Sequence, residues 1–193
     1  MATVKKRLFI AIDISDEARS AARTYIDLLK SKFPSAQVKW GAPENLHLTL
    51  KFLGSTDDEL VGRVVDLVRE RAKGTKPFEI EISGTGAFPS AKDPRVLWLG
   101  VKETSSTMKH LAELIDQDFS SLGFEQETRA FKPHLTIARV RDPRRAAALG
   151  GQHQSNSFGP IRFVSDELVL YESQLGRGGS TYTRLATAKF SGV

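Results

Sequence analysis

Residues 46–53 (LHLTLKFL) and residues 132–140 (KPHLTIARV) are two strand-like stretches of the same kind. Each contains His-Leu-Thr followed by Leu or Ile, beginning at His47 in the first and at His134 in the second. Apolar and polar residues alternate in the first stretch, which is typical of a strand with one buried face. Strict alternation predicts a buried face of Leu46, Leu48, Leu50 and Phe52 and an open face of His47, Thr49 and Lys51.

The segments that precede these stretches also match, so the chain contains an internal repeat. Strands are predicted over residues 7–14 and 95–101, and an amphipathic helix pattern follows each of them. The histidine of each stretch lies 38 residues after an apolar residue of the preceding strand, Phe9 or Val96. Each half of the chain therefore has the order strand, helix, then a strand with His-Leu-Thr.

Turn residues and apolar periodicity predict the remaining elements. A Thr56–Glu59 capping box is expected to open the second helix. We expect an α+β fold in one domain, residues 1–193, made of two repeated halves, about 1–90 and 91–193, that form two similar lobes. If a pseudo-twofold axis relates the lobes, the two histidines meet across a shared cleft. The other predicted elements are helices over 15–33, 104–122 and 142–149 and strands over 77–82, 84–88, 158–164, 166–173 and 180–190.

The composition limits the chemistry that the chain can perform. It has no cysteine, which excludes disulfides, cysteine nucleophiles and thiolate metal sites and fits a cytoplasmic location. The formal net charge of +5 suits an anionic partner without identifying one. No apolar run approaches the length of a membrane span, and the one near the N-terminus is too short for a signal peptide.

The two His-x-Thr pairs suit chemistry at a phosphoester. Residues two apart on a strand point the same way, so each stretch offers an imidazole and a hydroxyl to one space. Displacement at phosphorus needs a base on the attacking oxygen and an acid on the leaving oxygen. Imidazole titrates near ~6.5, so one ring of a pair can be neutral while the other is protonated. The hydroxyls of Thr49 and Thr136 can donate hydrogen bonds to the phosphate oxygens.

A lone histidine on a strand is more often structural than catalytic. Two of the chain's four histidines, however, occupy equivalent repeat positions, which favours a functional pair. His110 and His153 are expected on the surface. A metal site would need more ligands than two histidines, and Asp13 gains no support from its spacing, so we expect metal-free catalysis.

Several arginines follow the second stretch or lie near the last predicted hairpin. Arg139 has the same parity as Leu135 and Ile137, so it reaches the cleft only if the strand bulges or ends near Ala138. For Arg177 and Arg184, surface charge and nucleic-acid contact are equally good interpretations, and core packing is the expected fate of Trp40 and Tyr182. Solvated surface charges are expected at Arg141, Arg144 and Arg145.

The chain resembles the two-histidine (2H) phosphoesterase superfamily, and within it the bacterial and archaeal RNA 2',3'-cyclic phosphodiesterases, also called 2'-5' RNA ligases. The paired His-x-Thr motifs define the superfamily, and the flanking segments support the narrower resemblance over nearly the whole chain. The segments that carry it are RLFIAIDI (7–14), PENLHLTLKFLG (43–54), GAFP (86–89), RVLWLGV (95–101), FKPHLTIARV (131–140) and LYES with the glycine-rich hairpin after it (170–179).

The resemblance implies a bilobal LigT-like fold, with an antiparallel sheet in each lobe, helices outside and both motifs lining a central cleft. It implies metal-independent hydrolysis of an RNA 2',3'-cyclic phosphate to a 2'-phosphate. His47 would be the proton donor to the departing 3' oxygen, and His134 the proton acceptor that activates water. Thr49 and Thr136 would bind the phosphate, assisted by Arg139.

The resemblance also implies a 2'-5' ligation activity that needs no nucleotide cofactor, and the chain has no P-loop. We therefore expect no cofactor, no metal and no membrane partner, a monomeric protein, and as partner an RNA or nucleotide with a 2',3'-cyclic phosphate end. Two alternatives remain open. One is a phosphodiesterase for another cyclic or 2'-5' linked nucleotide, and the other is a non-catalytic RNA-binding module.

Overall fold

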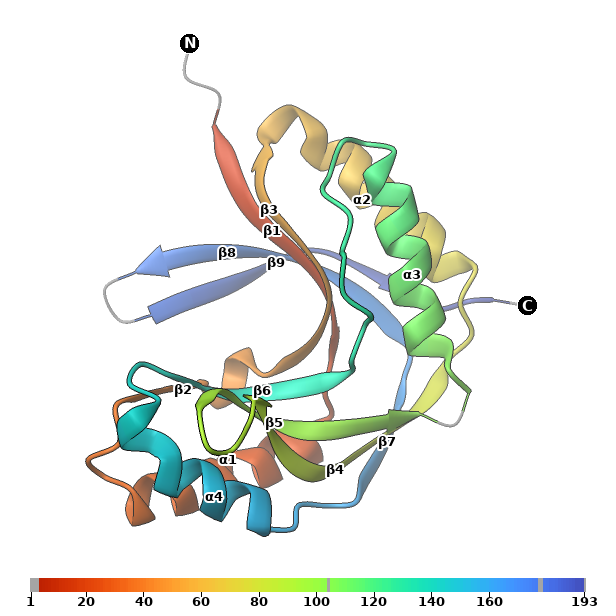
Figure 1. Ribbon diagram of the computed structural model, residues 1–193. Helices are drawn as coiled ribbons and strands as arrows, with labels where there is room; N and C mark the ends of the chain where they lie inside the picture. The colour runs from red at the N-terminus through yellow and green to blue at the C-terminus, as the bar shows by residue number, and fades with distance from the viewer. Residues whose placement is uncertain (1–3, 104, 177–178, 193) are drawn as a thin grey trace.

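The computed structural model describes residues 4–103, 105–176 and 179–192 (Figure 1). The strands are β1 (Lys5–Asp13), β2 (Val38–Trp40), β3 (His47–Asp57), β4 (Phe78–Pro89), β5 (Pro94–Glu103), β6 (His134–Val140), β7 (Ile161–Ser165), β8 (Glu167–Gly176) and β9 (Gly179–Lys189). The α-helices are α1 (Asp16–Lys32), α2 (Val61–Lys73), α3 (Thr107–Ser120) and α4 (Ala147–Ser155), and the 3-10 helices are η1 (Pro43–Asn45), η2 (Asp58–Leu60) and η3 (Arg144–Ala146). No helix of the described residues is long and apolar enough to span a membrane.

The strands form two antiparallel sheets with helices on their outer sides (Figure 1). The four-stranded sheet has the order β3-β1-β8-β9, and α2 and α3 pack against it. The five-stranded sheet has the order β2-β6-β5-β4-β7, with α1 and α4 on its outer side. The expected α+β architecture with two lobes is therefore confirmed.

The two lobes differ from the two sequence halves that were expected to form them. Each sheet takes strands from both halves, because β4 joins β5 and β6 whereas β8 and β9 join β1 and β3. The order β3-β1-β8-β9 of one sheet corresponds strand for strand to β6-β5-β4-β7 of the other. The repeat therefore holds for the two sheets, although each sheet combines strands from both halves of the sequence. A short connection between β4 and β5 lets them pair as a hairpin across the boundary of the halves.

Local capping decides where α1 begins, and strand pairing decides where α2 begins. Ser15 caps α1, as predicted, by accepting a hydrogen bond from the backbone N–H of Ala18 at 3.2 Å. The capping box expected at Thr56–Glu59 does not form, because β3 continues to Asp57 in register with the start of β1. The α-helix α2 accordingly begins only at Val61, without a side-chain cap.

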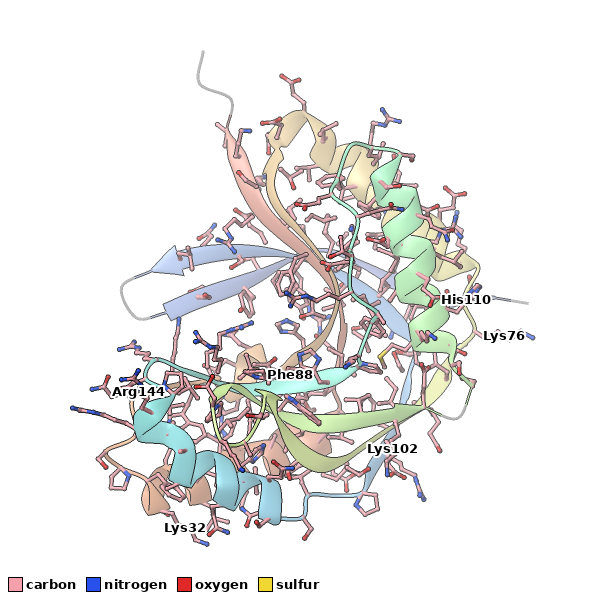
Figure 2. All side chains as sticks on the ribbon, viewed as in Figure 1. Lys32, Lys76, Phe88, Lys102, His110 and Arg144 are labelled. Carbon is pink, nitrogen blue, oxygen red and sulfur yellow. The ribbon has the colours of Figure 1, made fainter. Side chains whose placement is uncertain are left out.

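His153, which was expected on the surface, is fully buried. Its Nε2–H donates to the carbonyls of Gly86 and Trp98, both at 3.1 Å, and Nδ1 lies 2.8 Å from the hydroxyl of Tyr25. Burial lowers the pKa of His153, which favours the neutral ring that these contacts require. His153 is thus a structural residue. His110 is exposed on the outer side of α3, as predicted (Figure 2).

Candidate active site

Both strands that carry a His-x-Thr motif bulge one residue after the threonine. Along β1 and β3, Thr49 pairs with Ala11 and Lys51 with Ile10, which leaves Leu50 as the extra residue. The second motif strand, β6, contains the equivalent bulge, as its register with β5 shows: Thr136 pairs with Trp98 and Ala138 with Leu97, so Ile137 is extra. A bulge reverses the alternation of side chains beyond it.

The bulges decide where the next side chains point. Arg139 was expected to reach the cleft only if its strand bulged or ended near Ala138. The bulge at Ile137 fulfils this condition, and Arg139 lines the cleft. In β3 the prediction from strict alternation is wrong beyond Leu50: Lys51 is buried at 2% exposure, and Phe52 is 55% exposed. Bulge positions depend on the partner strand, so a single sequence does not reveal them.

A cavity of about 500 Å³ lies between the two sheets. It is lined by all five side chains proposed from the sequence, with His47 and Thr49 from β3 and His134, Thr136 and Arg139 from β6. The structure therefore brings the two motifs to one cleft, as the repeat predicts.

The two imidazoles are oriented in the same way. The Nδ1–H of His47 donates to the carbonyl of Asn45 at 2.6 Å, and that of His134 donates to the carbonyl of Lys132 at 2.7 Å. A carbonyl only accepts, so it selects the tautomer with hydrogen on Nδ1. The Nε2 atom of each neutral ring is then the atom that can accept a proton.

The surroundings of the two rings differ. His47 stacks on Phe9 with 4.7 Å between ring centroids and meets Tyr182 edge-on at 5.4 Å. Burial lowers the pKa of His47, although the Asn45 carbonyl and the Asp13 carboxylate oppose this effect. His134 instead contacts Phe88 edge-on at 5.1 Å.

Hydrogen bonds with two elements, α1 and β9, hold the segment before His47. The guanidinium of Arg19, on α1, donates to the carbonyls of Pro43 at 2.7 Å and Leu46 at 3.2 Å. The side-chain amide of Asn45 donates to the carbonyl of Ser180, on β9, at 3.0 Å. The carbonyl that orients His47 is thus positioned from both lobes. Arg19 and Asn45 were not named from the sequence, and Phe9 was named only as a reference position of the repeat, because each looks like an ordinary helix, loop or strand residue.

Asp13 contributes to the neighbouring polar network. Its carboxylate accepts a hydrogen bond from the Tyr171 hydroxyl at 2.6 Å and forms an ion pair with Arg184, which also pairs with Glu167. Arg184 is therefore held in ion pairs, and Arg177 lies outside the described residues. Within the described ranges, no group of three His, Cys, Asp or Glu side chains could hold a metal ion.

The cavity is electropositive. Arg7 and Lys39 line it together with Arg139, and no lining residue that the structure describes is acidic. Trp40 and Tyr182, expected in the core, both line the cavity while partly buried. Arg141, Arg144 and Arg145 are exposed, as predicted. The cleft thus offers hydroxyl and imidazole groups to an anionic ligand in a positive field.

Two lobes of matching topology, each contributing a histidine and a threonine to one cleft, define the two-histidine phosphoesterase class. A family model described as the 2'-5' RNA ligase superfamily matches residues 16–177, and the chain belongs to that superfamily. The RNA 2',3'-cyclic phosphodiesterase of Methanothermobacter thermautotrophicus is 40% identical over 93% of this chain and 96% of its own length. The protein of the same name from Thermotoga maritima is 35% identical over 96% of each chain.

Solved structures support the fold in the same way. TT0787 of Thermus thermophilus superimposes with a TM-score of 0.81 at 26% identity, over 96% of this chain and 98% of that one. Escherichia coli LigT, in complex with 3'-AMP, superimposes with a TM-score of 0.73 at 27% identity, over 97% and 99% of the two chains. The LigT-like fold expected from the sequence is therefore confirmed.

Proposed function

We propose that the chain hydrolyses the 2',3'-cyclic phosphodiester at the end of an RNA to a 2'-phosphomonoester. The observation that carries the proposal is the convergence of both His-x-Thr pairs on one positively charged cavity. Relatives that match nearly the whole chain are named RNA 2',3'-cyclic phosphodiesterases, which supports the same reaction. A chain without cysteine suits a reducing compartment, so we also propose a cytoplasmic location. We propose in addition that the protein is a monomer.

The proposed reaction is an in-line displacement by water. His134 accepts a proton from water through Nε2 while the water oxygen bonds to phosphorus. The bond from phosphorus to the 3' oxygen breaks, and His47 gives its Nε2 proton to that oxygen. The hydroxyls of Thr49 and Thr136, with the guanidinium of Arg139, bind the non-bridging oxygens and stabilise their developing charge. Proton exchange with solvent restores both rings.

If the 5'-hydroxyl of a second RNA took part in this chemistry, a 2'-5' linkage would result. In that reaction the 2',3'-cyclic phosphate remains the electrophile, the attacking oxygen comes from RNA, and no phosphate is supplied by a nucleotide. The same two histidines would serve, because an acid and a base are again required on opposite sides of phosphorus. We therefore propose ligation as a secondary activity of the same cleft.

The activity is tested with an oligonucleotide that ends in a 2',3'-cyclic phosphate, incubated with the protein in EDTA. We expect hydrolysis at an undiminished rate and a product with its phosphate on the 2' oxygen, identified by chromatography against both isomers. A 3'-phosphate product would reverse the roles of the two histidines. Loss of activity in EDTA, restored by added divalent metal, would exclude the metal-independent mechanism.

The pH profile assigns the roles of the histidines independently. Replacing Tyr182 by serine removes the ring edge that covers His47 and should raise the pKa of His47 towards its ordinary value. A proton donor acts only when protonated, so the alkaline limb of the kcat/KM profile should then move to higher pH. If His47 were the acceptor, the acid limb would move upward instead. Tyr182→Phe keeps the ring and is the matched control.

A further inference from the structure

The internal repeat places different residues beside the two motif histidines. In the register of β1 with β3, Asp13 pairs with His47, and in the register of β5 with β6, Gly100 pairs with His134. Residues directly opposite on antiparallel strands project from the same face, with Cβ atoms roughly 5 Å apart. A carboxylate therefore lies beside the ring of His47, and the equivalent position beside His134 has no side chain.

The backbone of the second lobe leaves no room for a carboxylate at Gly100. A Cβ atom at this position would lie 2.4 Å from the carbonyl oxygen of Ser83 on β4, closer than real Cβ atoms approach backbone. The difference between the two histidines is therefore built into the packing of the strands.

The neighbouring strands extend the same difference. Tyr171 on β8 pairs with Phe9 of β1, and Phe88 on β4 pairs with Val96, the equivalent residue of β5. Tyr171 and Phe88 therefore occupy equivalent positions, but only the tyrosine has a hydroxyl. That hydroxyl donates to the carboxylate of Asp13 at 2.6 Å. The four-stranded sheet thus holds a carboxylate with a group that the other sheet lacks at the matching place.

Asp13 lies beside the imidazole and outside the cavity. Its side chain is 15% exposed, and it is not among the residues that line the cavity. The carboxylate is held from two strands, by the hydroxyl of Tyr171 on β8 and by an ion pair with Arg184 on β9. Asp13 can therefore act on His47 through space without touching a ligand in the cleft.

The charges around His47 act against each other. Burial of the ring and the guanidinium groups of Arg19 and Arg139 lower the pKa of His47, whereas the Asp13 carboxylate raises it. Burial also raises the pKa of the Tyr171 hydroxyl, which therefore keeps the proton that it donates to Asp13. The other titratable groups that line the cavity with His47 are Arg7, Lys39, His134 and Tyr182. Asp13 thus supplies negative charge to a ring that faces positive charge from the cleft.

We propose that Asp13, held by Tyr171 and Arg184, assigns the acid role to His47 by placing a carboxylate beside one of two otherwise equivalent histidines. This inference rests on the proposed function, in which one histidine must donate a proton and the other must accept one. A neighbouring carboxylate favours the protonated ring, so His47 begins the reaction as the donor and His134, without such a partner, as the acceptor. Asp13 is a positioning residue, because it acts through His47.

The test measures the pKa of each histidine ring by NMR titration of the free protein. Asp13→Asn removes the negative charge and should lower the pKa of His47 by about 1, at the low end of the effect of a neighbouring charge, because Arg184 already offsets part of it. Arg184→Met removes that offsetting cation and should raise the pKa of His47. The pKa of His134 should stay the same in both variants. Looser packing around His47 would raise its pKa in both, so shifts in opposite directions are specific to the charge.

The same variants should change the pH profile of hydrolysis of a cyclic-ended RNA. The alkaline limb of the kcat/KM profile reports the donor, so it should move to lower pH in Asp13→Asn and to higher pH in Arg184→Met. At a pH above this limb, Asp13→Asn should be about 10-fold slower than the unmodified protein, since a change of 1 in pKa changes the protonated fraction tenfold. Arg184 keeps Glu167 as its partner at 3.1 Å, so Asp13→Asn should fold.

Asp58→Asn is the matched control. It removes the same charge beyond the far end of β3, where the Asp58 carboxylate pairs with Lys6 at 2.9 Å, and it should change neither the histidine pKa values nor the profile. An unchanged or raised pKa of His47 in Asp13→Asn would overturn the inference, as would a shift of the acid limb in place of the alkaline limb. The NMR titration needs no substrate, so it tests Asp13 separately. Failure of the unmodified protein to hydrolyse a cyclic-ended RNA would contradict the proposed function itself.

Discussion

Replacing His134 by alanine is expected to lower kcat for a cyclic-ended RNA by about 10²- to 10⁴-fold, the contribution of a positioned general base. The protein should still fold, because His134 is only half-buried and its polar contact within the chain is with the Lys132 carbonyl. The rate is measured under single-turnover conditions, and the fold by circular dichroism and urea unfolding. His47→Ala should lose activity to a similar extent.

The control for both histidine variants is His110→Ala, on the exposed side of α3. It should retain the full rate. The double variant His47→Ala/His134→Ala should be little slower than either single variant, because an acid and a base acting in one step are not additive. A single variant that retained a near-native rate would contradict the paired mechanism.

Replacing Lys51 by alanine is expected to lower the free energy of unfolding by about 3–5 kcal/mol, as when one partner of a buried ion pair is removed. The buried Nζ of Lys51 lies 2.5 Å from the carboxylate of Asp116 on α3 and 2.8 Å from the carbonyl of Glu125. The same carboxylate accepts the backbone N–H of Glu127. Without the lysine, the carboxylate and the Glu125 carbonyl lose their charged partner. Equilibrium urea unfolding measures the effect.

Lys102→Ala provides the matched control, since Lys102 forms an ion pair with Glu81 while its side chain is 72% exposed. Exposed ion pairs contribute little to stability, so this variant is expected to lower the free energy of unfolding by less than about 1 kcal/mol. Lys51→Met retains most of the buried stem and separates the lost charge from lost packing. Equal stability of the Lys51 and Lys102 alanine variants would show that the buried ion pair of Lys51 and Asp116 contributes no more to folding stability than an exposed pair.

Much of the site was predictable from the sequence because its signal is local and repeated. The His-x-Thr spacing orients two groups on any strand, and the repeat indicates that two such strands are equivalent. Their meeting in one cavity follows from the matching sheet orders. The contacts that orient His47, from Arg19 and Asn45, were not predictable because they join segments with no recognisable motif.

The parts of the fold that were missed depend on distant strands. Whether Lys51 or Phe52 points inward is fixed by the register with β1, which inserts a bulge at Leu50. The sequence around His153 predicts an exposed loop, but the packing of α4 against β4 and β5 buries this residue. Local propensity carries no information on either contact, so tertiary structure overrides it.

The exchange of strands between the two halves has a consequence for how the molecule comes apart. Neither half contains a complete sheet, since β4 and β8 each complete the sheet begun by the other half. A chain divided between β4 and β5 would leave open strand edges on both fragments, which favours aggregation over independent folding. We therefore expect the two lobes to unfold together in one cooperative transition, which thermal unfolding followed by circular dichroism and by tryptophan fluorescence would test. The strands that carry His47 and His134 are therefore expected to lose their structure in the same unfolding transition.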